Sequence, residues 1–148
     1  ITELAVRRRR DMAKEKSSLV PGIESVLNYL QSRKIPTGIA TGSRRTLVET
    51  ILQTYHLADQ FTTIITGEDY THSKPHPQSF LTAKRGLQSS HPLIIEDSVA
   101  GIRAAREAGA TVYALTTTLD RSYLQEADKI FSNHHEVLEE LTASSRTP

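Results

Sequence analysis

Five short apolar runs alternate with amphipathic segments along the chain, and this alternation constrains the fold more than any other feature. The runs read "IPTGIA", "TTIIT", "PLII", "TVYALT" and "KIF". Between them, apolar residues recur at helical spacing, as Ile23, Val26, Leu27 and Leu30 do. Strands that alternate with helices predict a parallel sheet covered on both faces. We therefore expect an α/β fold with a Rossmann-like parallel sheet.

Composition narrows the class of protein further. A chain of 148 residues fits one core, and 18 basic against 17 acidic side chains give no general reason to expect a nucleic-acid partner. No apolar run approaches the roughly 18 residues that a membrane-spanning helix needs, so we expect no membrane segment. The absence of cysteine excludes disulfides and thiolate chemistry, and it fits a reducing, cytoplasmic location.

Ligands of open parallel sheets bind beyond the carboxyl ends of the strands, so the residues after each run are the place to look for chemistry. Thr41, Gly42 and Ser43 follow the first run. They offer a hydroxyl, a close backbone approach and a side chain expected to cap the next helix. Amides at a helix N-terminus favour an anion such as phosphate. Ordinary helix capping also explains this segment when it is taken alone.

Charged residues follow the next two runs. Lys74 precedes a proline, which favours an extended backbone from which the ammonium group can reach the crevice; a solvated surface lysine is the alternative. Glu96 and Asp97 end "PLII", and two adjacent buried carboxylates need a cation or a set of donors. Mg²⁺ prefers such ligands, although capping of the following helix by Asp97 and Ser98 is the simpler alternative. Together, the three strand ends predict a Mg²⁺ and phosphate site.

Four stretches, "LVPGIESVLNYL", "IATGSRR", "SKPHPQSF" and "IIEDSVAGIRAAREAGA", resemble the haloacid dehalogenase superfamily, specifically its subgroup of β-phosphoglucomutases and phosphoglycolate phosphatases. The similarity runs from about residue 4 to residue 114. The resemblance implies that Thr41 is the hydroxyl of the second motif and Lys74 the lysine of the third. It also implies that Glu96 and Asp97 are the acids of the fourth motif, which hold Mg²⁺.

The resemblance further implies phosphoryl transfer from a small-molecule phosphate ester through an aspartyl-phosphate intermediate. Gly42, Ser43 and Arg44 would line the phosphate site, and Arg8 would contact the rest of the substrate. Arg7 or Arg9 would serve as well as Arg8. The run of arginines at 7–10 has no interleaved aromatic residues, which argues against a nucleic-acid surface.

The family's first motif, an apolar strand ending in Asp-x-Asp-Gly-Thr, does not occur in these 148 residues. In the family this strand lies between those that end at Thr41 and at Glu96, so we expect two unpaired strand edges there. Either an N-terminal portion is not part of this sequence, or another chain supplies the strand. We favour the first, because residues 1–18 have the helical composition of a remnant of the family's cap domain, followed by an incomplete core at 19–148.

We therefore expect a Mg²⁺-dependent phosphatase of a small phosphorylated metabolite, such as a sugar phosphate, as the full-length protein, and an inactive chain when it is alone. Two alternatives stay open. One is a phosphomutase of the β-phosphoglucomutase type, and the other is a non-catalytic phosphate-binding domain that lost its nucleophile. A phosphorylatable receiver domain is disfavoured, because "TTIIT" leads into Gly67 and not into an aspartate.

Overall fold

The computed structural model describes residues 6–7 and 18–145. In this part of the chain no helix is long and apolar enough to cross a bilayer. The elements, in chain order, are β1 (Val6–Arg7), β2 (Ser18–Leu19), α1 (Ile23–Ser32), β3 (Gly38–Ala40), α2 (Arg45–Thr54), η1 (Ala58–Gln60), β4 (Thr63–Ile65), α3 (Gln78–Gly86), β5 (Leu93–Glu96), α4 (Val99–Glu107), β6 (Thr111–Leu115), η2 (Arg121–Tyr123), β7 (Lys129–Phe131) and α5 (His134–Ser144).

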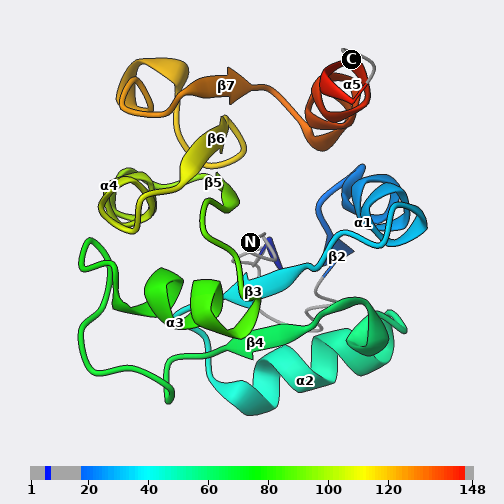
Figure 1. The fold of residues 1–148 in the computed structure, drawn as a ribbon, viewed down its shortest axis with the longest axis vertical. Helices are drawn as coiled ribbons and strands as arrows, with labels where there is room; N and C mark the ends of the chain where they lie inside the picture. Colours follow the sequence, from blue (N-terminus) through cyan, green and yellow to red (C-terminus); the bar gives the residue numbers. More distant parts are fainter. Residues whose placement is uncertain (1–5, 8–17, 146–148) are drawn as a thin grey trace, which may run out of the picture.

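All five predicted strands are present, and every ladder among them is parallel (Figure 1). They form two separate sheets, β3–β4 and β5–β6–β7, and no ladder joins β3 to β5 in the described part of the chain. The α/β class with parallel strands is therefore confirmed. The central discontinuity falls where the sequence predicted two unpaired strand edges.

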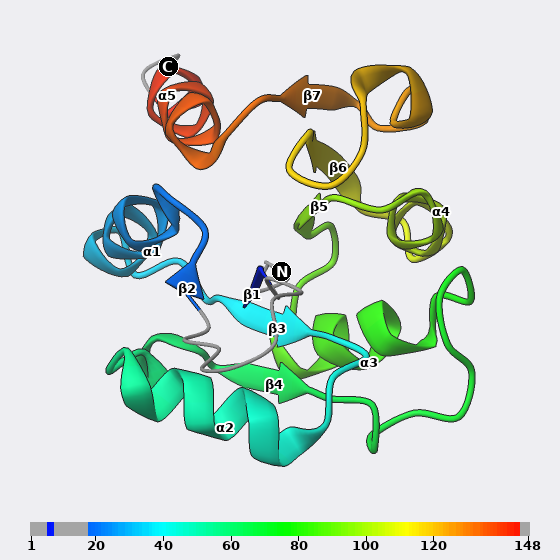
Figure 2. The same cartoon turned by 180° about the vertical axis from the view of Figure 1, so that it is seen from behind.

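Helices cover both faces of the strands, because neighbouring strand residues point to opposite sides. Ala40 and Ile94 share one apolar cluster with α3 and α4. Their neighbours point the other way: Ile39 packs with α1 and α2, and Ile95 packs with α5. Figure 2 shows α1 and α5 side by side on that second face, and the two helices are in contact.

Local signals explain where α4 begins and ends. Ser98 is the N-cap, and its hydroxyl oxygen accepts a hydrogen bond from the Gly101 amide at 3.0 Å. The helix stops before Gly109, whose φ of +72° is unfavourable for residues with a side chain. These two signals therefore bound the helix at Val99–Glu107.

Of the N-terminal segment that was predicted to be helical, the structure describes only Val6 and Arg7. The sequence predicted helical structure over residues 1–17, whereas Val6–Arg7 forms a short antiparallel ladder with Ser18–Leu19. A ladder between two distant segments is a tertiary contact that helical spacing of four apolar residues does not report. The rest of the predicted cap remnant lies outside the described residues.

Candidate active site

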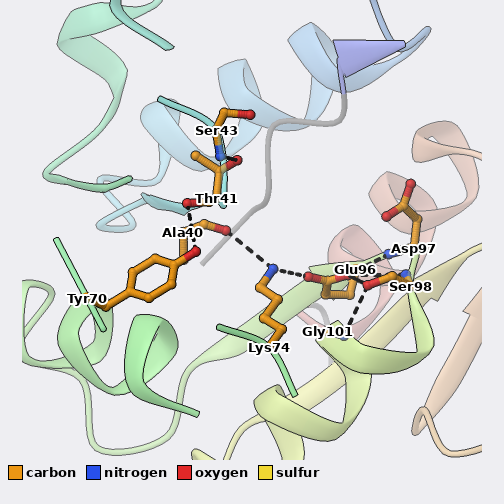
Figure 3. Close-up of polar contacts among 9 residues, drawn as sticks. All are labelled: Ala40, Thr41, Ser43, Tyr70, Lys74, Glu96, Asp97, Ser98 and Gly101. Carbon is orange, nitrogen blue, oxygen red and sulfur yellow. Dashed lines mark hydrogen bonds and ion pairs between the residues drawn. The ribbon is translucent and has the colours of Figure 1, made fainter. Parts of the chain in front are cut away.

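Lys74 lies between the carboxyl ends of β3 and β5 (Figure 3). Its ammonium group donates to the Ala40 carbonyl at 3.5 Å and forms an ion pair with Glu96 Oε1. It also lies 4.5 Å from the centre of the Phe80 ring. The Lys74 side chain is only 13% exposed, so this interaction is largely shielded from water. One buried cation therefore links the two sheets at the edge where ligands of such folds bind.

Glu96 is buried, and donors surround its carboxylate. While Oε1 pairs with Lys74, Oε2 accepts the Asp97 amide at 3.0 Å, the Ser98 amide at 3.2 Å and the Ser98 hydroxyl at 3.0 Å. A Cβ at Gly101 would overlap the Glu96 carboxylate, so any larger residue at that point of α4 would displace the acid. These hydrogen bonds and the ion pair offset the free-energy cost of burying one acid next to another.

Asp97 points in a different direction from Glu96 (Figure 3). Its Oδ2 accepts hydrogen bonds from the Thr118 hydroxyl at 2.6 Å and the Thr117 hydroxyl at 3.3 Å. No described residue bonds the other carboxylate oxygen. The two adjacent acids thus differ: Glu96 is saturated by the protein, and Asp97 keeps one oxygen for another ligand.

The loop after β3 is held by its neighbours. The Thr41 amide extends the ladder by donating to the Ile65 carbonyl at 2.9 Å, and the Thr41 hydroxyl oxygen accepts the Ser43 amide at 3.1 Å. The Gly67 amide donates to the Ser43 carbonyl at 3.0 Å, and a Cβ at Gly67 would lie 2.8 Å from the Gly42 carbonyl oxygen. The Tyr70 hydroxyl donates to the Thr41 carbonyl at 3.4 Å.

The expectation that Ser43 caps α2 is wrong. The N-cap is Arg44, which makes no capping side-chain bond, and the Arg45 amide instead donates to Glu68 Oε2 at 3.0 Å. The hydroxyl of Ser43 is one residue too early, and a carboxylate from the loop after β4 takes the capping role. One amide at the predicted phosphate-binding helix terminus is therefore already occupied by an anion.

Hydrogen bonds keep the two acids of that loop ionised. The Arg45 amide and the Thr66 hydroxyl lower the pKa of Glu68. Burial alone would raise the pKa of Asp69, but bonds from the Thr66 amide and hydroxyl and from the Arg45 guanidinium outweigh it and lower that pKa. The loops after β3 and β4 are thus joined by a network of charged hydrogen bonds.

Two of the predicted substrate contacts stay predictions. Arg44 is exposed at the start of α2. Arg8 lies outside the described residues. The described polar cluster therefore consists of Thr41 and its loop, Lys74, and the two acids after β5.

The donor chemistry around Asp97 fits Mg²⁺ in part. Mg²⁺ commonly binds one or two carboxylates and completes its shell with water and phosphate oxygens. Asp97 offers one such oxygen, whereas both Glu96 oxygens are engaged. No group of three or more acidic or histidine side chains gathers within the described residues. Further ligands would come from residues outside this part of the chain, from water or from a phosphate group.

The sequence analysis did not identify the residues that bond Asp97, or the two acids, Glu68 and Asp69, that bond Arg45. Thr117 and Thr118 lie two and three residues after β6 ends at Leu115, so the rule that pointed to the first three strand ends also points to them. Glu68 and Asp69 had a weaker signal, because acids in a loop are usually solvated. Only the fold brings them to the start of α2.

Comparison with known proteins extends the likeness beyond the site. The sequence model of haloacid dehalogenase-like hydrolases matches residues 1–115. Validoxylamine A 7'-phosphate phosphatase of Streptomyces hygroscopicus subsp. limoneus is 35% identical over 120 residues, which are 80% of this chain and 56% of that protein. Phosphoglycolate phosphatase of Escherichia coli is 31% identical over 108 residues, covering 72% and 43%.

Solved structures with a similar fold belong to the same family. A haloacid dehalogenase hydrolase of family IA from Entamoeba histolytica has a TM-score of 0.74 at 28% identity, covering 82% of this chain and 58% of that one. β-Phosphoglucomutase of Clostridium difficile has a TM-score of 0.71 at 27% identity, covering 82% and 55%. This chain spans about half the length of the curated relatives that it matches. The chain belongs to the haloacid dehalogenase-like hydrolases.

Proposed function

We propose that this chain is the core part of a Mg²⁺-dependent phosphatase that acts on a small phosphorylated metabolite through an aspartyl-phosphate. The nucleophilic aspartate would come from a segment outside the 148 residues. The observation that carries the proposal is the position of the Lys74 ammonium, which bonds both the end of β3 and Glu96 at the end of β5. A cation at that place suits a phosphoryl group whose charge must be neutralised.

Each residue of the polar cluster would have a role in phosphoryl transfer. Because the Thr41 oxygen already accepts the Ser43 amide, its proton is available to donate to a phosphoryl oxygen. Lys74 would offset negative charge on the phosphoryl oxygens, and the ion pair with Glu96 holds it in position. Asp97 would hold Mg²⁺, oriented by Thr117 and Thr118. The metal would supply further positive charge at the phosphate.

The names of the relatives support a phosphate ester as the substrate class, since they include a validoxylamine A 7'-phosphate phosphatase and a phosphoglycolate phosphatase. Transfer to a second substrate, as in a phosphomutase, is the second candidate. It draws on the similarity to β-phosphoglucomutase of Clostridium difficile. Adding a sugar phosphate acceptor and following the distribution of the phosphoryl group would distinguish the two.

The decisive experiment uses the longest gene product that contains this sequence, with p-nitrophenyl phosphate as substrate. We expect Mg²⁺-dependent phosphate release that falls about 100-fold or more in Lys74→Met, which removes a positive charge beside the phosphoryl group, and in Asp97→Asn, which replaces a carboxylate ligand of Mg²⁺ by a neutral amide. Lys84→Met is the matched control, since the Lys84 ammonium bonds the Ala108 carbonyl away from the site. Activity that survives Lys74→Met within a few-fold would contradict the proposal.

The 148-residue chain should show no such turnover by itself, because it lacks the proposed nucleophile. The same assay checks this expectation with the isolated chain and excess Mg²⁺. Mg²⁺-dependent hydrolysis that disappears in Asp97→Ala would mean that the chain contains its own nucleophile.

A further inference from the structure

Three successive main-chain carbonyls of the turn after β3 contact the loop that follows β4. The Tyr70 hydroxyl donates to the Thr41 carbonyl at 3.4 Å (Figure 3), and the Gly67 amide donates to the Ser43 carbonyl at 3.0 Å. The Gly42 carbonyl oxygen between them lies so close to Gly67 that a Cβ there would be 2.8 Å from it. The loop after β4 therefore fixes the direction of each carbonyl in residues 41–43.

The direction of these carbonyls also sets the direction of the amides. The peptides of the turn are trans, so the carbonyl and the amide of each peptide point to opposite sides. The amides of Gly42, Ser43 and Arg44 therefore face away from the loop. The Ser43 amide bonds the Thr41 hydroxyl, whereas those of Gly42 and Arg44 donate to no group within the described residues. Successive amides on one side of a turn attract anions.

Tyr70 is placed behind the first of these peptides, the one between Thr41 and Gly42. Its ring packs against the apolar cluster that includes Phe80, so the hydroxyl extends from a fixed support. A hydrogen bond to a carbonyl polarises the peptide, which makes the amide of the same peptide a stronger donor. The distance of 3.4 Å is long for a hydroxyl donor, and such bonds tighten when a ligand binds to the site.

We propose that Tyr70 is a positioning residue for phosphate binding. Its hydroxyl orients and polarises the peptide between Thr41 and Gly42, so that the Gly42 amide points to the phosphoryl oxygens. Gly67 supports the next peptide by leaving room for its carbonyl. This inference rests on the proposed function, because it requires a phosphoryl group beside the turn. It adds to that function a side chain that acts through the main chain and does not touch the substrate.

The test uses the longest gene product that contains this sequence, labelled with ¹⁵N and titrated with inorganic phosphate in the presence of Mg²⁺. We expect Tyr70→Phe to weaken phosphate binding by about 3–10-fold, the effect of losing one neutral hydrogen bond. The shift of the Gly42 amide proton at saturating phosphate should become smaller. The kcat/KM for p-nitrophenyl phosphate should fall by a similar factor, because the donor stays in place but is less well directed.

Tyr29→Phe is the matched control for the lost hydroxyl. The Tyr29 hydroxyl donates to the Leu141 carbonyl at 3.3 Å, a bond of nearly the same length that joins α1 to α5. Both changes should lower stability to a similar extent. Only Tyr70→Phe should alter phosphate affinity and the Gly42 amide shift, and Tyr29→Phe should keep phosphate affinity within two-fold.

A second pair of variants tests the contact at Gly67. Gly67→Ala places a methyl group against the Gly42 carbonyl and should also weaken phosphate binding. Gly86→Ala is its control, because the added Cβ would lie 2.6 Å from the Thr63 hydroxyl oxygen, in the packing of α3 on β4. It should lower stability and leave phosphate affinity within two-fold.

Two outcomes would overturn the inference and leave the proposed function standing. One is equal phosphate affinity in Tyr70→Phe and Tyr29→Phe, and the other is a Gly42 amide that does not shift although phosphate binds. The proposed function fails in a different way: the unaltered protein then neither releases phosphate from p-nitrophenyl phosphate nor loses phosphate binding in Lys74→Met. In that case the inference fails with it.

Discussion

The two faces of the strand layer are built differently. On the α3–α4 face, one apolar cluster runs across both sheets and includes Ala40 from β3 and Ile94 from β5. On the opposite face, the neighbouring residues belong to separate clusters: Ile39 packs with α1 and α2, while Ile95 packs with α5. Side-chain packing on one face therefore joins two sheets that share no main-chain ladder.

One buried ionisable side chain on each face differs in how well its hydrogen bonds are satisfied. Glu96, which shares its side of β5 with Ile94, has its carboxylate satisfied by Lys74 and by the start of α4. On the other face, His134 at the start of α5 is buried, and neither ring nitrogen makes a hydrogen bond of normal geometry within the described residues, so the nearby Pro21 carbonyl satisfies the ring only in part. One face is continuous and the other is divided, but each has a buried polar group that lacks a normal hydrogen bond among the described residues, because the Ser79 hydroxyl in α3 also lacks one. The difference in continuity indicates which face holds the two sheets together.

The largest expected effect comes from the continuous face. Phe80 is fully buried in the cluster that spans both sheets, and its ring also contacts Lys74. We expect Phe80→Ala to lower the free energy of unfolding by about 3–5 kcal/mol, measured by urea denaturation. Native-state hydrogen exchange should then accelerate in β3–β4 and in β5–β7 together.

The matched change on the divided face is Val137→Ala, in a fully buried position of α5. It should lower the free energy of unfolding by about 2 kcal/mol and accelerate hydrogen exchange mainly in β5–β7. If Phe80→Ala opened only one sheet, or Val137→Ala opened both, the distinction between a continuous and a divided face would be wrong.

A smaller effect should follow from Gly101→Ala, which tests the satisfied acid. The added Cβ would overlap the Glu96 carboxylate, and such overpacking costs about 1–3 kcal/mol. This exceeds the roughly 1 kcal/mol that alanine gains over glycine within a helix. In a Glu96→Ala background the overlap disappears, so Gly101→Ala should become neutral or stabilising. Equal costs in both backgrounds, measured by thermal unfolding, would show that the carboxylate does not require this glycine.

The sequence predicted the parts of this arrangement that depend on local patterns. Apolar periodicity located the five strands of the two parallel sheets, and the rule about strand ends selected Lys74 and Glu96, which the structure brings into contact. The resemblance to the family supplied the expectation of a discontinuity between β3 and β5. Apolar periodicity can be read from short windows of sequence, and the position of a residue after a strand follows directly from chain order.

Contacts between distant segments were not predictable in this way. Glu68 is 23 residues from Arg45, and no local pattern reveals that it binds the first amide of α2 and displaces Ser43 from the capping role. In the sequence, His134 is one of two adjacent histidines, and nothing in the local pattern distinguishes the buried one from the exposed one. Its burial depends on the packing of α5 against α1, which places its Cβ near Gly22.

The smallest expected effect concerns His134 and tests the divided face. Burial lowers the pKa of His134, the charge of nearby His135 lowers it further, and the Pro21 carbonyl and the charge of Asp97 oppose the shift only in part. A lowered pKa means that the unfolded chain binds the proton more tightly than the folded chain does. The contribution to stability is therefore complete well above the ordinary pKa of 6.5 and is lost as pH falls below it.

Each pH unit below that value should cost up to about 1.4 kcal/mol until the folded group is also protonated. Urea denaturation between pH 8 and pH 5 measures this, and His134→Leu should flatten the decline. His135→Gln should flatten the decline only slightly, because the charge of that exposed ring is a smaller cause of the lowered pKa than burial is. An unaltered decline in His134→Leu would mean that this imidazole is solvated or satisfied in solution. The buried imidazole of the divided face would then be as well satisfied as the Glu96 carboxylate on the opposite face.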